Sequence, residues 1–458
     1  MVTTTPPAVP PLQLAPLLPT VDGIELMPMR ETRRNNRDLV LWITYINIVL
    51  YALCYQLQRP VEPFLVKSLT ENHDDPKYVS EKYSQLQSFF SAIQTVGSPL
   101  VGILLDRVGV RKASCLVFLA SALSYAILAS ATNMNLLFLS KVPTALQHAF
   151  LVAQAAAAIS TGSNAAARAQ ALGRMTTAYT IGGTIGPALG GWLVDTMGDL
   201  YLGAKLAVFG SLISVVLSVA FLPDEHVPDS SAPVKKNRSF LGELQNTYNI
   251  AMRPNLWPLL LVKIVGGFAS SMHSTALPLV LTQTLNFEPS QLGLTMSTAM
   301  FAVAAFGAFA MAPLTKILGL SSMGYTGLLM RAALVQVLAI IIATAVGNDR
   351  NVVMRVVASS ILHALASHVL ATALTTQTTG AVHKTEQGAL LGLEHGLFSL
   401  ARVGAPPTAS YLLTTSGFYA VALSCGAVDV ALVGLLVATA AQTQLKPVPM
   451  KADLEHSD

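Results

Sequence analysis

Residues 173–191 read GRMTTAYTIGGTIGPALGG, an apolar stretch whose spaced small residues and single proline are Gly173, Gly182, Gly186, Pro187, Gly190 and Gly191. Small residues four apart form a groove in which membrane helices pack closely. Pro187 lacks the amide that would bond back to Gly183, so a helix can bend there. Neighbouring helices and hydroxyl groups satisfy the freed backbone groups in such helices. The stretch predicts a membrane helix that is either a fixed packing face or a moving bend.

The composition of the whole chain fits this membrane setting. Of its 458 residues, 52% are hydrophobic and 11% are charged, and the mean hydropathy is +0.55. Soluble domains carry roughly 25% charged residues. The composition therefore excludes an ordinary soluble protein and predicts a multi-pass protein in a lipid bilayer.

Apolar windows near the ~20 residues that a spanning helix needs recur along the chain. They fall at 39–58, 86–105, 113–131, 135–158, 174–196, 201–222, 257–281, 291–313, 323–345, 352–376, 388–412 and 417–440. We predict an all-α membrane protein of 12 transmembrane helices in two pseudo-symmetric six-helix bundles, at 39–222 and 257–440. Residues 1–38 are predicted to be a disordered cytosolic tail, 223–256 a cytosolic linker and 441–458 a cytosolic tail.

The positions of lysine and arginine indicate the orientation of the chain. Basic residues concentrate in the first tail and the predicted inner loops, whereas the predicted outer loops hold few: Lys67, Lys77, Lys82 and Arg350. The positive-inside rule then places both termini in the cytosol. The protein itself is expected in the plasma membrane or in an organelle membrane. The net charge of +4 reflects this bias, so no nucleic-acid partner is predicted. The cysteines fall in predicted spans, which argues against disulfides.

The two halves of the chain resemble each other weakly. Ser84-Gln85-Leu86 recurs as Ser290-Gln291-Leu292, and Leu172-Gly173 with Pro187 recurs as Leu391-Gly392 with Pro406. Repeated six-helix halves are typical of transporters built from internal repeats. The positions that match the later glycines are alanine or serine in the second half, so the run of glycines belongs to the first half alone.

A second motif joins the second and third windows, and its chemically distinctive members are Gly102, Asp106, Arg107, Gly109, Arg111 and Lys112. Glycine at 109 allows a positive φ in a short turn. The acid can face a helix N-terminus and the arginines can pair with carboxylates. A plain positive-inside anchor would explain Arg111 and Lys112, but not the acid followed by a fixed glycine.

These motifs resemble the major facilitator superfamily, whose inner loop reads G-x3-D-R-x-G-[RK]-[RK]. Val110 departs from this pattern, and the glycine series resembles the superfamily's antiporter motif. Segments such as Ser140-Lys141-Val142-Pro143 are similar to the organic cation transporter-like solute carriers of family 22 and to drug:proton antiporters. The resemblance implies a secondary transporter that exchanges an organic cation or drug-like amine for protons by alternating access. It also implies that the motif at 102–112 latches a cytosolic gate.

Ionisable residues within spans are costly and are functional candidates by default. Lys141 and His148 lie seven apart in the fourth window, about two helical turns, so we expect them on one face as proton-coupling groups. The alternatives are a lysine that reaches the interface and a histidine bonded to a backbone carbonyl. In the first window, Tyr55 and Gln56 are the expected substrate contacts, because both donate and accept hydrogen bonds.

The second half offers further candidates for proton coupling or substrate binding: His273, His363, Glu394 and Arg402. We expect Arg402 to need a partner, which could be Glu394, a substrate anion or a backbone carbonyl. Lys263 and Arg331 are expected to reach the membrane surface, Arg59 with Glu62 to form a solvated pair at the outer edge, and Asp429 to lie at the periphery. His363 and His368 point to different faces, so no metal site is predicted.

The substrate and the class of function keep alternatives at this stage. The deep ionisable residues are mostly basic and the first window lacks an acid, which leaves a facilitator of an organic anion or zwitterion open. A non-transporting receptor or scaffold with the same fold is the rival from another class. We find no catalytic constellation and no phosphate loop, so we expect no enzyme, no cofactor and no metal. The expected partners are the bilayer, a small organic solute and protons, and we expect a monomer.

Overall fold

The computed structural model of the chain describes residues 28–162, 164–224, 245, 248–345, 349–382 and 387–445. Within these ranges all regular structure is helical. Nine helical segments of this described part are long and apolar enough to cross a membrane, judged by length and composition. The protein is therefore a multi-pass, all-helical membrane protein, and the more detailed count of twelve spans stays a prediction.

The helices fall into two groups along the chain. The N-terminal group comprises α1 (Pro28–Gln58), α2 (Glu62–Leu69), α3 (Pro76–Ala129), α4 (Met134–Lys141), the 3-10 segment η1 (Val142–Leu146), α5 (Ala149–Thr161), α6 (Ala165–Met197) and α7 (Leu202–Phe221). The C-terminal group comprises α9 (Trp257–Gln283), α10 (Pro289–Phe309), α11 (Met311–Thr344), α12 (Arg350–Gly380) and α13 (Gln387–Leu445).

Left-handed glycines explain why some predicted spans share one element. Gly109 (φ 78°) interrupts α3, and Gly417 (φ 76°) interrupts α13. Each glycine marks a kink between two helices of one element: Gly109 lies between two predicted windows, and Gly417 lies at the start of the last one. Gly319 (φ 72°) interrupts α11 in a conformation close to that of Gly109, because glycine lacks the Cβ that penalises positive φ. The positive φ expected at Gly109 is confirmed.

The ends of the chain differ from the predicted boundaries. Helix α1 begins at Pro28, ahead of the predicted start of the first span at residue 39, and α13 continues to Leu445. Proline suits the first turn of a helix, and the arginines that follow favour helix. Residues 1–27, most of the predicted linker and the last residues lie outside the part that is described.

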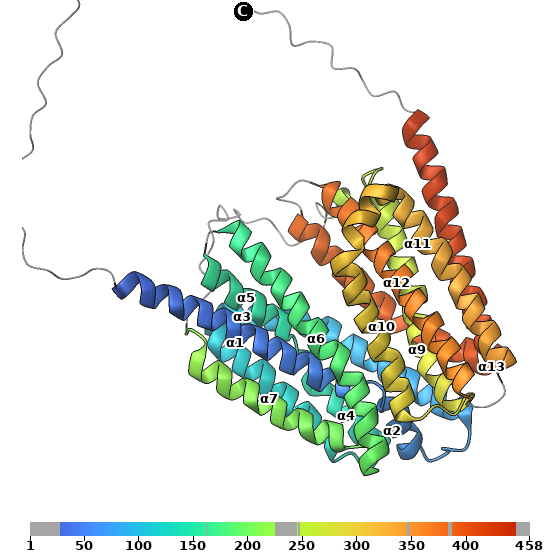
Figure 1. Cartoon of the computed structure of the whole chain (residues 1–458), viewed down its shortest axis with the longest axis horizontal. Coiled ribbons are helices and arrows are strands. Elements are labelled where there is room, and N and C mark those ends of the chain that lie inside the picture. Colours follow the sequence, from blue (N-terminus) through green and yellow to red (C-terminus); the bar gives the residue numbers. More distant parts are fainter. Residues whose placement is uncertain are drawn as a thin grey trace, which may run out of the picture.

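Each group has its own apolar core. Residues of α1, α3, α5 and α6 pack around Ile48, Val117 and Ala156, whereas α9, α11, α12 and α13 pack around Ala276, Val356 and Ala405. Figure 1 shows the two groups side by side, meeting near α2 and diverging toward the opposite end. Between the groups, α6 packs on α10 and α3 packs on α13.

Three glycines of the series at 173–191 bring α6 against α1 within the N-terminal group. A Cβ at Gly182 would lie 2.5 Å from the carbonyl oxygen of Val49, and a Cβ at Gly186 would lie 2.7 Å from Cβ of Gln56. Gly190 lies against the backbone of Leu57. These glycines therefore form a close helix contact, as small residues four apart predict.

The contact at Gly191 is different because it joins the two groups. This glycine lies against the backbone of Pro289 at the start of α10, and Gly293 lies against the backbone of Pro187. The amide of Ala188, which follows the proline of α6, donates to the hydroxyl of Ser297 at 2.8 Å. Gly173 has nothing within 4 Å of a built Cβ, so it has no packing role in this arrangement.

Candidate functional site

A polar cavity of about 250 Å³ lies between the two groups. Its N-terminal wall is formed by Arg59, Tyr83, Gln87 and Ser91, and its C-terminal wall by Gly267, Ser270, Ser271, Ser274, Thr275, Phe398, Arg402 and Pro406. We call it the central cavity. The described residues that line it include two arginines and no carboxylate. Its lining therefore suits a solute with an anionic group, because guanidinium groups bind carboxylates and phosphates with two parallel hydrogen bonds.

Arg402 is placed in this cavity without a partner of opposite charge. No described residue forms an ion pair or hydrogen bond with its side chain. The sequence-based expectation that Glu394 serves as its partner is wrong, since Glu394 pairs with Lys263 instead. An arginine deep in a membrane protein needs a counter-charge, and a solute anion can supply one.

A buried acid-base cluster lies beside the central cavity. Nζ of Lys141 is 2.5 Å from Oε1 of Glu62, and Nε2 of Gln87 donates to Oε2 of the same carboxylate at 2.6 Å. The lysine and glutamate side chains are 13% and 11% exposed. The expectation of a solvated pair between Arg59 and Glu62 is therefore wrong: α2 begins at Glu62 and carries the acid inward, where Lys141 at the end of α4 meets it.

Lys141 and His148 do not share a helical face. The fourth window is broken by η1, and His148 stands just before α5 rather than within one continuous helix. Pro143 in η1 supplies the local reason, because proline cannot donate an interior helical bond. Nε2 of His148 is buried and has no partner among the described residues.

The two expected contacts of the first span have separate surroundings. The ring of Tyr55 stacks on those of Tyr51 and Phe90, at centroid distances of 6.4 and 6.2 Å, and lines the small pocket around Lys141. Gln56 instead faces α6, where its amide lies 3.5 Å from the hydroxyl of Tyr179. Tyr55 therefore lies with the acid-base cluster and Gln56 with the helix contact.

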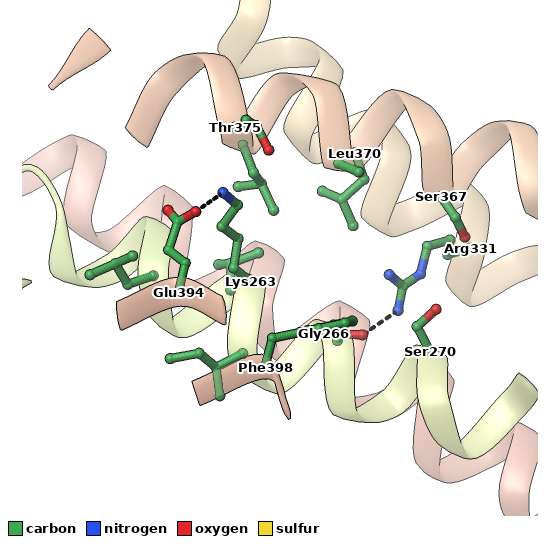
Figure 2. Close-up of a pocket in the computed structure, with 15 residues that line it drawn as sticks. Lys263, Gly266, Ser270, Arg331, Ser367, Leu370, Thr375, Glu394 and Phe398 are labelled. Carbon is green, nitrogen blue, oxygen red and sulfur yellow. Dashed lines mark hydrogen bonds and ion pairs between the residues drawn. The ribbon is translucent and has the colours of Figure 1, made fainter. Parts of the chain in front are cut away.

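A larger cavity of about 440 Å³ lies within the C-terminal group, between α9, α11, α12 and α13. Figure 2 shows Lys263 reaching Glu394 at one end of it and Arg331 at the other. Nζ of Lys263 lies 2.6 Å from Oε2 of Glu394 and 3.3 Å from the hydroxyl of Thr378. We call this cavity the side chamber. Lys263 is bound inside the protein and does not extend to the surface as expected.

Arg331 and Asp429 form a second buried ion pair. The guanidinium contacts both carboxylate oxygens, at 2.9 and 3.1 Å, and also donates to the carbonyl of Gly266 at 3.1 Å. Their side chains are 5% and 2% exposed. The expected surface position of Arg331 and the peripheral position of Asp429 are therefore both wrong, because each residue is the other's buried partner. The pair fixes α11 to α13 and to the backbone of α9.

The two histidines singled out in the second half meet each other. The rings of His273 on α9 and His363 on α12 lie 4.2 Å apart between centroids, tilted by 33°. Both are buried, and Nδ1 of each has no partner among the described residues. Neither lines the central cavity or the side chamber. Within the described part of the chain, no three metal-ligating residues gather.

The loop motif at 102–112 lies at the end of the N-terminal group. Asp106 and Arg107 are exposed, and Nε of Arg111 donates to the carbonyl of Leu222 at 2.5 Å. Arg111 therefore ties α3 to the end of α7 within its own group. A latch to the C-terminal group remains a prediction for another conformation.

Reasoning from the sequence missed Gln87 and the partners of Lys263 and Arg331, and it placed Arg59 and Glu62 at the outer edge rather than at the site. A usable signal was present in the charge inventory: in the second half, the deep bases Lys263 and Arg331 are matched by the deep acids Glu394 and Asp429. Pairing each buried base with a buried acid would have proposed these contacts. Gln87 carried no comparable signal, because glutamine recurs throughout the first half.

Helical spans in two groups, with a polar cavity between them and buried ion pairs beside it, define the class of multi-pass, all-helical membrane proteins built from two helical groups. The family model of the Major Facilitator Superfamily matches residues 44–271 and 259–453. The chain belongs to the major facilitator superfamily.

Named relatives support this assignment. The chain is 28% identical over 268 residues to solute carrier family 22 member 18 of Mus musculus. The matched region covers 57% of this chain and 64% of that protein. It is 22% identical over 260 residues to multidrug resistance protein 2 of Bacillus subtilis. That matched region covers 56% of this chain and 62% of the bacterial protein. The chain thus matches less than two thirds of the length of these curated relatives.

Solved structures share the fold across most of the chain. The crystal structure of the human organic anion transporter MFSD10 matches with a TM-score of 0.60 and 20% identity, covering 87% of this chain and 99% of that one. The nucleoside transporter NupG matches with a TM-score of 0.66 and 12% identity, covering 88% and 99%. At these identities the matches establish the fold.

Proposed function

We propose that this protein is a secondary transporter that carries a small organic solute across a membrane by alternating access. The central cavity is the proposed solute site, and the observation that carries the proposal is the pair of arginines, Arg59 and Arg402, that line it from opposite groups. A solute held between two groups can be exposed to either side when the groups rock against each other.

We further propose that the solute bears an anionic group. The described carboxylates near the cavities are already paired with bases: Glu62 with Lys141, Glu394 with Lys263 and Asp429 with Arg331. An amine entering the central cavity would meet two guanidinium groups and no carboxylate on its described lining. The electrostatics therefore favour the anion or zwitterion over the organic cation that the family 22 resemblance suggests.

An organic cation exchanged for protons is the second candidate. A proton on Glu62 would release Lys141, and the carboxylate could then serve an amine and a proton in turn. This candidate is supported by the small pocket that Glu62 and Lys141 line together with Tyr55 and Gln58. The antiporter-like glycine series is consistent with it, but the glycines serve packing in this conformation.

The test is uptake into liposomes that contain the purified protein, with and without an imposed pH gradient. The probes are an aromatic carboxylate, an aromatic amine and a neutral aromatic alcohol of similar size, with proton flux recorded. We expect saturable uptake of the carboxylate. Preference for the amine would support the second candidate, and uptake that ignores the gradient would indicate a facilitator. No saturable uptake of any probe by folded protein would favour the receptor or scaffold.

A further inference from the structure

The side chamber differs from the central cavity in the chemistry of its walls. Its lining is mostly aliphatic and aromatic and includes Leu260, Val262, Ile264, Leu370, Leu374 and Phe398. Among the described lining residues, the charged groups stand at its two ends, as Figure 2 shows for Glu394 with Lys263 and for Arg331. An apolar chamber of this size with a few polar groups matches the usual form of a small-molecule pocket.

Two buried side-chain atoms of the chamber have no hydrogen-bond partner among the described residues, Oε1 of Glu394 and Oγ of Ser367. Arg331 is engaged by Asp429 and Gly266, and Lys263 is engaged by Glu394 and Thr378. Oε1 of Glu394 is buried and accepts no hydrogen bond from the described residues. A carboxylate oxygen can only accept, so the complementary ligand group must be a donor.

The chamber is adjacent to the central cavity. Gly267, Ser270 and Phe398 line both spaces. Glu394 and Arg402 stand eight residues apart on α13, which corresponds to about 12 Å along a helix at 1.5 Å per residue. The free acceptor and the unpaired guanidinium thus belong to adjacent cavities, and Phe398, which lies between them along α13, is part of the wall that the cavities share.

We propose that the side chamber is a second subsite, which receives the apolar body and a protonated amine of an amphoteric solute whose anionic group sits at Arg59 and Arg402. This proposal rests on the proposed function and narrows its substrate class. The amine donates to Oε1 of Glu394, and the apolar body lies against Leu370, Leu374 and Phe398. Lys263 keeps Oε2 and so holds the carboxylate in place for the ligand.

The charges of the chamber suit this ligand. Glu394 and Lys263 balance each other, as do Arg331 and Asp429, so an incoming amine meets no net positive charge there. The amine can donate to Oε1 of Glu394, a buried carboxylate oxygen that has no other partner among the described residues. A hydrogen bond to a charged group contributes about tenfold or more to affinity, so losing the amine should weaken binding by at least that factor.

The experiment compares three probes built on one rigid skeleton. The amphoteric probe is an aminomethyl biphenyl carboxylate with its charged groups at opposite para positions. Its N-acetyl derivative keeps the anion alone, and its methyl ester keeps the amine alone. Uptake into proteoliposomes is measured without a pH gradient, and the result is the ratio of KM for the N-acetyl probe to KM for the amphoteric probe. We expect a ratio of about ten or more in the wild type.

Glu394→Gln is the decisive variant, because it keeps the size of the side chain and an oxygen for Lys263 while removing the charge. We expect the KM ratio to fall toward one. Asp199→Asn is the control: it also neutralises an acid paired with a lysine, Lys205 at 2.7 Å, but one in the N-terminal group and away from the chamber lining. In the control we expect any loss to affect both probes equally, so that the ratio stays at the wild-type value.

Each outcome decides one of the two proposals. A wild-type ratio near one, or a ratio unchanged in Glu394→Gln, overturns the subsite while leaving the anion site standing. Failure of the N-acetyl and amphoteric probes alike to be taken up overturns the proposed function itself. If Glu394→Gln does not fold, Glu394→Asp replaces it, because it withdraws the charge by one methylene and should also lower the ratio.

Discussion

Gly191 of α6 lies directly against the backbone of Pro289 at the start of α10, so the N-terminal and C-terminal groups touch there without a side chain between them. The nearby amide of Ser290 donates to Oδ2 of Asp195 at 3.0 Å. The contact closes the space between the groups at the end of α6, and any atom added to the glycine must push the groups apart.

The first prediction follows from this contact. Gly191→Ala should disfavour the conformation described here and open the end at which α6 meets α10. The measurement is maleimide labelling of Ser80→Cys, a buried position that contacts Gln283 across the groups, in a chain with its native cysteines replaced. Labelling should rise several-fold. Gly434→Ala, where a Cβ meets nothing within 4 Å, should leave the labelling unchanged. Equal labelling in both variants would contradict the idea that a Cβ at position 191 pushes the two groups apart.

The other glycines of the series should affect stability rather than conformation. A Cβ at Gly190 would overlap the backbone of Leu57, so Gly190→Ala should lower the stability of the N-terminal group by about 1–3 kcal/mol, the usual cost of overpacking. Thermal unfolding in detergent measures the change. Gly173→Ala is the control in the same helix, and it should be neutral or slightly stabilising because alanine favours helix. A destabilised Gly173→Ala would show that space does not explain the difference.

The buried pair of Glu62 and Lys141 should behave differently from an exposed pair. Glu62→Gln leaves a lysine ammonium buried without its counter-charge, and breaking such a pair costs about 3–5 kcal/mol. The double variant with Lys141→Met should recover most of this loss, as a thermal-unfolding cycle would detect. The exposed pair of Asp199 and Lys205, at 2.7 Å, is the comparison and should contribute at most about 1 kcal/mol. Additive effects at Glu62 and Lys141 would contradict their coupling.

The response of uptake to a pH gradient should depend on Glu62 and not on the neighbouring histidines, His273 and His363. Glu62 contacts Gln87, which lines the central cavity, whereas His273 and His363 line neither cavity. Glu62→Gln should therefore make uptake insensitive to an imposed pH gradient, and His363→Phe should retain that sensitivity. Loss of the gradient response in His363→Phe alone would assign the proton to the histidine pair.

How far the sequence reached can be judged from particular residues. Periodic apolar windows located the spans, and the φ of Gly109 could be anticipated because only glycine suits a left-handed turn. Pro143 is visible in the sequence as a possible break in the fourth span. The spacing of about two helical turns between Lys141 and His148 places them on one face only if the helix is continuous. The pairing of Glu62 with Lys141 depends on how α2 folds back after α1, a tertiary feature that no local pattern contains.

The site shows the same limit. The sequence indicates that Arg402 needs a partner, but it leaves Glu394, a substrate anion and a backbone carbonyl open as alternatives. Lys263 comes from a different helix and lies closer to Glu394, at 2.6 Å. Local periodicity orders residues along one helix, whereas ion pairs between helices depend on the packing of the whole group.

Arg402 is also where the central claim can be tested most directly. Arg402→Gln removes the unpaired charge from the cavity between the groups, and Arg355→Gln removes an exposed charge on α12. The measurement is counterflow of the N-acetyl derivative of the aminomethyl biphenyl carboxylate, in proteoliposomes preloaded with the same compound. We predict that Arg355→Gln keeps saturable counterflow with the wild-type affinity. In Arg402→Gln, the affinity for the probe should fall about tenfold or more, the expected scale for a hydrogen bond to a charged group. Wild-type counterflow in folded Arg402→Gln would contradict the account.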